Sequence, residues 1–341
     1  MMHRKKQRNV VFEIIKIYLS FVILVYHYNI FFCDNTNPLL FRGGYIAVDV
    51  FFAISGYFLF FTFHRNAHIR PFLIMFSKMK KMWPDYLICL ACSVVAWFLL
   101  KGLTQSDIFQ IIKEILYVQE WIPPSRTMIN GPTWYISAMF FCTFVFAFLY
   151  RFIPEKYCLF ILGVLLTFGI SIMWFQYGTI RIHGNFFYFI FSSGVIRGFV
   201  GMIIGLLIGH LDKDNYFGKK RFAWIPFFIG FVGVSIFFFI AGVNRHDILC
   251  LPFIALFIIG AVMLSKKQMA VPSTIIWLLS DLSLHIYLLQ RAWQMICLRF
   301  FKNIPVPTYI IVLLIACLLW FGIKYTFKFV IGQKQKNNVS K

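Results

Sequence analysis

The chain has 341 residues, of which 60% are hydrophobic and 20% aromatic, and its formal net charge is +21 at pH 7. A mean hydropathy of +0.78 excludes a soluble globular domain and indicates a polytopic membrane protein. The positive charge does not indicate a nucleic-acid partner, because the Lys and Arg flank apolar runs, where they meet the anionic head groups of membrane lipids.

Runs of about 20 apolar residues predict an all-α fold, a polytopic membrane helix bundle with ten transmembrane helices. These are expected at residues 11–32, 44–63, 84–100, 132–152, 157–176, 189–209, 223–242, 247–264, 272–292 and 308–330. Most Lys and Arg then lie on the side of the N-terminus, so the positive-inside rule predicts that both termini are cytoplasmic. We expect one transmembrane domain at residues 1–332 and a short basic tail at residues 333–341. The scattered Cys form no metal-ligand spacing, and no metal site is expected.

The first predicted helix contains Lys16 and His27, which lie eleven residues apart. Their spacing advances a helix by about 1,100° and places both on one face. An ionisable group within a membrane span is costly and is therefore a candidate for function. The alternative is a neutral His27 held by a neighbouring helix.

The second predicted helix carries Asp49 at about the same depth as His27. This match permits a His–Asp pair, in which the carboxylate orients the imidazole while the imidazole takes a proton from a hydroxyl group. The alternative is that Asp49 caps a loop at the membrane interface. Both residues are candidate catalytic groups.

Clustered cations precede the third predicted helix, among them Lys78 and Lys81. On the cytoplasmic side they suit a phosphorylated ligand, although Lys lacks the bidentate fork of Arg. Their charge alone is better explained by membrane topology. The long external segment that follows contains Trp121 and leads to Trp134, which are candidate acceptor-binding residues or interfacial anchors.

Arg197 lies in the sixth predicted helix and needs a partner such as Asp49 or Asp281, unless it binds a donor molecule. The glycines at 201, 205 and 209 that follow it allow another helix to come close. In the ninth predicted helix, His285 and Asp281 share a face at i, i+4 spacing, and they form an alternative catalytic pair.

Several of these segments, in order from about residue 11 to 330, resemble the membrane-bound acyltransferase 3 family. They are Glu13–Lys16 with His27, Val48–Tyr57, Lys78, Lys81, Pro84 and Tyr86, Trp134–Ser137, Arg197–Gly198 with Gly205, and Leu282–Leu289. The resemblance implies a multi-pass O-acyltransferase of the bacterial cytoplasmic membrane. Such an enzyme transfers an acyl group, usually acetyl, from cytoplasmic acetyl-CoA to a hydroxyl of an extracytoplasmic or lipid-linked glycan. It would hold no permanent cofactor.

By position in the family pattern, His27 corresponds to the catalytic histidine, and Lys16, Lys78 and Lys81 correspond to arginines associated with the acyl donor. These lysines keep the charge but not the planar fork. Met139 stands where many members carry an acidic residue, and Gln290 where a histidine is common. Because of these departures, an alternative is that the protein is an inactive relative of the family.

Two further alternatives remain at this point. A transporter or flippase would also suit a ten-span protein with intramembrane His, Asp and Arg. Within the enzyme interpretation, the acyl group either passes directly to the acceptor or first to a tyrosine such as Tyr26 or Tyr28. The acceptor is open among O-antigen, capsule, exopolysaccharide and glycolipid.

Overall fold

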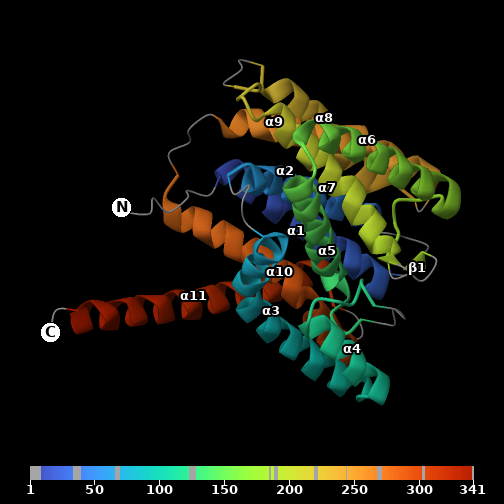
Figure 1. Cartoon of the computed structure of the whole chain (residues 1–341). Coiled ribbons are helices and arrows are strands. Elements are labelled where there is room, and N and C mark those ends of the chain that lie inside the picture. Colours follow the sequence, from blue (N-terminus) through green and yellow to red (C-terminus); the bar gives the residue numbers. More distant parts are fainter. Residues whose placement is uncertain are drawn as a thin grey trace.

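A computed structural model describes residues 9–33, 40–65, 70–122, 128–183, 186–187, 191–218, 222–242, 244–266, 271–301 and 304–339, without the side chains of 186, 187, 191 and 327–339. The described chain is a helix bundle (Figure 1), which confirms the predicted all-α class. Its helices are α1 (Val10–Phe32), α2 (Ala47–Arg65), α3 (Pro71–Lys101), α4 (Gln105–Ile115), α5 (Trp134–Phe152), α6 (Glu155–Ser171), α7 (Ser193–Leu211), α8 (Trp224–Ile240), α9 (Cys250–Ser265), α10 (Ser273–Phe300) and α11 (Val306–Val339). Two-residue strands β1 (Phe186–Phe187) and β2 (Phe191–Ser192) pair antiparallel.

Eight helices of the described chain are long and apolar enough to cross a membrane. The other two expected spans correspond to α8 and α10. With 17 residues, α8 is only about 26 Å long, slightly shorter than the apolar core of a bilayer. Polar residues, Asp281, His285 and Gln290 among them, lower the hydropathy of α10, and His285 and Gln290 are buried in the bundle.

Two regions differ from the expected helices. The segment after α3, which the sequence predicts to be external, contains a further helix, α4, which begins with a capping box between Thr104 and Asp107. Hydrogen bonds from Thr104 lower the pKa of Asp107. At the other end of the chain, α11 continues to Val339, so the segment expected as a tail is helical, and α11 projects from the bundle (Figure 1).

The helices α6, α8 and α9 lie on one side of α1, α2 and α7, and α3, α4 and α11 lie on the other (Figure 1). Glycines allow α2 and α7 to pack closely, as the sequence predicts. A Cβ atom added at Gly205 would lie 2.0 Å from the carbonyl oxygen of Ala53, and one at Gly56 would lie 2.0 Å from that of Met202. Only glycine permits backbones to approach this closely.

The helices α1 and α10 run parallel and in contact. Ser20 in α1 contacts Ser283 in α10, with 3.1 Å between their Oγ atoms. Two turns further along both helices, His27 contacts Gln290. The sequence separation is 263 residues in each case, which requires the two helices to advance in the same direction.

Candidate active site

A cavity of about 430 Å³ opens among α1, the start of α2, the loop before α5, α7 and α10. Its basic lining residues are His27, Arg181, His183, Arg197 and Arg291. Its aromatic lining residues are Tyr26, Phe31, Tyr45, Trp134 and Tyr287. Among the described residues, no Asp or Glu lines this cavity. The cavity therefore combines flat aromatic surfaces with an excess of positive charge.

His27 lies half-buried in the cavity wall, and its hydrogen bond to Gln290 determines its tautomer. His27 Nδ1 lies 3.1 Å from Gln290 Oε1. The amide nitrogen of Gln290 donates to the Tyr287 carbonyl at 2.9 Å, so Oε1 is the amide atom that faces the imidazole. Because Oε1 can only accept, Nδ1 must carry a proton, and a neutral imidazole then has its lone pair on Nε2. This is the arrangement that a general base requires.

Asp49 and Arg197 form an ion pair beside the cavity. Arg197 Nε donates to Asp49 Oδ1 at 2.9 Å, and Nη2 donates to Oδ2 at 2.6 Å. The two side chains are 1% and 2% exposed. Nη2 also donates to the Tyr45 carbonyl at 2.6 Å. The predicted Asp49–Arg197 pairing is thus present, and it satisfies the bidentate geometry that makes such pairs strong.

The expected contact between His27 and Asp49 is not formed. Both carboxylate oxygens of Asp49 accept hydrogen bonds from Arg197, and Gln290 occupies the position beside the His27 ring that the carboxylate was expected to take. The reason is electrostatic: a buried guanidinium without a carboxylate partner costs more than a neutral imidazole without one. Asp49 therefore acts on the site through Arg197.

Trp134 and Trp121 have different surroundings. Trp134 lines the cavity, stacks on His183 with ring centroids 5.1 Å apart, and lies 5.3 Å from the Arg197 guanidinium carbon. Trp121 donates to the Ser137 carbonyl at 2.9 Å and is not among the lining residues. The geometry therefore favours Trp134 alone as a surface for an acceptor.

The loop that precedes Trp134 is held by α4. Glu114 accepts hydrogen bonds from the backbone nitrogens of Ile129 at 2.8 Å and Asn130 at 3.0 Å. Asn130 in turn donates to the Leu288 carbonyl of α10 at 3.0 Å. Burial raises the pKa of Glu114, while the Asn130 N–H opposes that rise. These bonds fix one wall of the cavity to another.

The lysines expected to bind the donor lie outside the cavity lining. Lys16 forms an ion pair with Glu13 at 2.9 Å. Lys78 is partly exposed and Lys81 exposed in the first half of α3, and neither forms an ion pair with a described residue. The structure thus separates these cations from His27.

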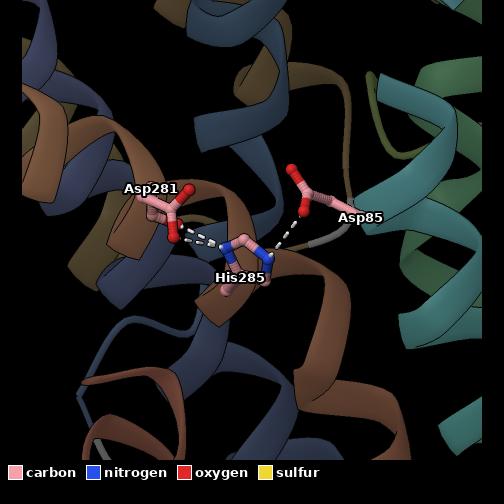
Figure 2. A group of neighbouring side chains, drawn as sticks. All are labelled: Asp85, Asp281 and His285. Carbon is pink, nitrogen blue, oxygen red and sulfur yellow. Dashed lines mark hydrogen bonds and ion pairs between the residues drawn. The ribbon is translucent and has the colours of Figure 1, made fainter. Parts of the chain in front are cut away.

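A second polar cluster joins α3, α10 and α11 inside the bundle. Figure 2 shows His285 between two carboxylates, with Nδ1 3.2 Å from Asp281 and Nε2 3.7 Å from Asp85. Lys324 binds both carboxylates at 2.7 Å. The three residues of Figure 2 could offer ligands to a metal ion, but the Lys324 ammonium already forms an ion pair with each of the two carboxylates.

This cluster bears on the choice of catalytic histidine. His285 is 1% exposed, both of its ring nitrogens face carboxylates, and it does not line the cavity. His27 reaches the cavity with Nε2 not hydrogen-bonded to any described residue. The geometry therefore favours His27 over the pair of His285 and Asp281.

A comparison with protein families now decides the class of the protein. The family model described as an acyltransferase domain matches residues 9–325, nearly the whole chain. The chain belongs to the acyltransferase 3 family. It is an acyltransferase built from apolar, membrane-spanning helices, and the transporter interpretation is set aside. Neither the curated proteins nor the solved structures gave a match.

Several residues of this acyltransferase site were not expected from the sequence. Gln290, noted only as a departure from the family pattern, holds His27. Arg181 and Arg291 line the cavity without having been singled out. An available signal was that Arg291 follows His285 on a largely apolar helix. Asp85 and Lys324 were not singled out either, because they lie 239 residues apart and no local pattern connects them.

Proposed function

We propose that this acyltransferase transfers an acyl group, acetyl in the simplest case, from cytoplasmic acyl-CoA to a hydroxyl of a cell-surface glycan, with His27 as general base. The observation that carries the proposal is the His27–Gln290 hydrogen bond, which leaves Nε2 free at a cavity of about 430 Å³. The cavity has aromatic surfaces suited to sugar rings, and no carboxylate of a described residue lines it and would compete as a base.

In the proposed reaction, the acceptor hydroxyl gives its proton to His27 Nε2 as its oxygen attacks the thioester carbonyl. The tetrahedral intermediate then collapses, the carbon–sulfur bond breaks, and the CoA sulfur takes the proton back from His27. Arg197 is the group best placed to stabilise the intermediate, because its Nη1 forms no hydrogen bond with a described residue. Asp49 acts by holding that guanidinium in place.

The donor is proposed to reach His27 from the cytoplasmic half of the bundle, with its phosphates near Lys78 and Lys81. Asp85 of α3 contacts His285 of α10, so these two residues lie at the same height along the bundle axis. Gln290 of α10 and His27 of α1 likewise share one height, because they are in contact. Lys81 is four residues before Asp85, and Gln290 is five after His285, so the rise from Lys81 to His27 is about 14 Å. An extended pantetheine arm spans this distance. Lys16, one and a half turns from the start of α1, provides a further cation on the same side.

The proposed location is the bacterial cytoplasmic membrane, with both chain ends in the cytoplasm. The distribution of Lys and Arg supports this orientation. An orientation with both chain ends in the cytoplasm requires the two ends to lie on one side of the bundle. The start of α1 and the end of α11 do lie toward the same side (Figure 1).

The geometry also bears on a covalent acyl relay. Tyr28 donates to the Ile304 carbonyl at 2.6 Å and does not line the cavity, whereas Tyr26 does. Direct transfer needs no group beyond those already positioned, and it is the route proposed here. A relay through Tyr26 would leave an acetylated tyrosine that mass spectrometry detects after incubation with donor alone.

The test uses the full chain in lipid nanodiscs with radiolabelled acetyl-CoA and glycan from the native cell surface. We expect His27→Ala to abolish transfer of label to the glycan while the protein remains folded. The matched control is His246→Ala, because His246 is exposed outside the cavity lining. Transfer by His27→Ala at the rate of the control would reject His27 as the base.

A further inference from the structure

We propose that the acceptor carries a carboxylate or phosphate group, and that Arg181 and Arg291 bind this group in the cavity. The inference rests on the proposed function, since it takes the cavity to be the acceptor site, and it adds the chemical class of the acceptor. An uncharged sugar would need neither arginine.

The positive charges of the arginines that line the cavity exceed the negative charges of their described carboxylate partners. Within the part of the chain that the structure describes, three arginines line the cavity, and Arg197 alone among them has a carboxylate partner. No described carboxylate forms an ion pair with Arg181 or Arg291. Two positive charges therefore face the cavity, one on the exposed Arg181 and one on the partly buried Arg291, and a cleft lined by one sign of charge concentrates their field on an entering ligand. An anion is the partner that these charges lack.

The Arg291 guanidinium has few hydrogen-bond partners within the described chain. Its Nε atom is buried without a hydrogen-bond partner in the described chain. Its Nη1 atom makes one long contact, 3.5 Å, to Gln294. The carboxylate that interacts electrostatically with Arg291 is that of Glu114, but the Glu114 oxygens accept hydrogen bonds from Ile129, Asn130 and Gln110. An unpaired cation within a membrane span is costly and marks a functional position.

The guanidinium groups of Arg181 and Arg291 each lie against aromatic rings. The Arg291 guanidinium lies 4.8 Å from the centre of the Phe31 ring. The Arg181 guanidinium lies 5.8 Å and 5.9 Å from the Tyr26 and Tyr45 rings. Cation–π contact positions a guanidinium through its face and leaves the N–H groups at its edge available. Such edges bind carboxylate or phosphate in bidentate fashion.

Hydrogen bonds to Asp247 hold the backbone just before Arg181 in place. Asp247 accepts hydrogen bonds from the Thr179 hydroxyl and from the Ile180 backbone nitrogen, the latter at 2.8 Å. Tyr45 donates to the same carboxylate at 2.8 Å. Arg181 thus follows a backbone that is anchored to the cavity wall. A preorganised cation loses little entropy when it binds an anion.

The anion has two possible sources, an acidic sugar or the phosphate of a lipid-linked sugar. The test measures binding in nanodiscs without acetyl-CoA, so that its result does not depend on catalysis. The probes are a glucuronic-acid oligosaccharide, its neutral methyl ester, and a polyprenyl diphosphate-linked sugar. Binding of either anionic probe identifies the source of the charge.

We expect Arg181→Gln and Arg291→Gln each to weaken binding of the anionic probe by roughly 10- to 100-fold, as for loss of a charged hydrogen bond. Arg291→Lys should lose less, because it keeps the charge. The control is Arg42→Gln, since Arg42 is exposed outside the cavity lining. Raised salt should weaken binding to the wild-type protein, which tests the proposal without any substitution.

Equal affinity for the acid and its methyl ester, together with no measurable binding of the diphosphate-linked sugar, would overturn the inference, as would unchanged affinity for the bound anionic probe in both Gln variants. If the neutral ester is also acetylated in a His27-dependent reaction, the proposed function stands while the inference fails. If the arginines govern binding of the anionic probe but His27→Ala still transfers acetyl, the anion site stands and the catalytic assignment fails. The two proposals are therefore separable.

Discussion

Replacement of Gln290 by Leu tests the mechanism most directly. Leu has a similar size but can accept no hydrogen bond, so the substitution removes the 3.1 Å contact to His27 Nδ1 and the 2.9 Å bond to the Tyr287 carbonyl. His27 would no longer be held with its proton on Nδ1. We expect the turnover number to fall while KM for the acceptor changes little, because Gln290 does not line the cavity.

The expected magnitude follows from these two contacts. A donor left without a partner costs about 1–3 kcal/mol, and each 1.36 kcal/mol corresponds to about a tenfold change in rate. The turnover number should therefore fall about 10- to 100-fold. The effect should stay below the roughly 10⁴-fold loss seen when the ionised orienter of a serine protease triad is neutralised, because Gln290 is uncharged.

The assay is the initial rate of acetyl transfer over a range of acceptor concentrations. Gln290→His, which restores the residue common in the family, should recover most of the rate because an imidazole can also accept from Nδ1. The control is Gln176→Leu, since Gln176 is exposed and is not among the residues that line the cavity. Wild-type turnover in Gln290→Leu would refute the positioning role.

Three further predictions follow from the structure. Replacing Asp49 with Leu should destabilise the protein by about 3–5 kcal/mol, because it leaves Arg197 charged, buried and unpaired; thermal unfolding measures this, and adding Arg197→Met should recover stability but not activity. Replacing Lys78 and Lys81 with Gln should raise KM for acetyl-CoA with a smaller change in turnover number, whereas Arg at both positions should preserve or lower KM. Gly205→Leu should prevent close packing of α2 and α7, since even a Cβ atom would meet backbone at 2.0 Å, and should lower the unfolding temperature by several degrees.

Each of these predictions has a control and a contrary result. Gly163→Leu is the control for Gly205, because no atom lies within 4 Å of a Cβ added there. An equal effect at both glycines would show that close packing is not the cause. Full stability of Asp49→Leu would mean that Arg197 finds another partner. An unchanged KM for acetyl-CoA without Lys78 and Lys81 would place the donor phosphates elsewhere.

The sequence alone predicted the helix bundle well, because hydropathy is a local property. Each of the ten expected spans corresponds to a helix, although α8 is short and α10 is less apolar than the rest. Burial of Arg197 could also be anticipated, and so could its need for a carboxylate, since an unpaired charge in a membrane span is costly. The close contact at Gly205 followed from the spacing of small residues.

The pairing of side chains was decided only by the tertiary structure. The similar depth of His27 and Asp49 in the membrane suggested that they are in contact, but depth does not determine how each helix is rotated about its axis. In the structure, Asp49 pairs with Arg197 and His27 contacts Gln290. Gln290 lies 263 residues from its partner, so no local pattern connects them. Arg181 and Arg291 likewise acquire a shared role only where folding brings a loop and a helix to one cavity. Hydropathy determines which segments cross the membrane, whereas the rotation and packing of those segments determine which polar groups meet inside it.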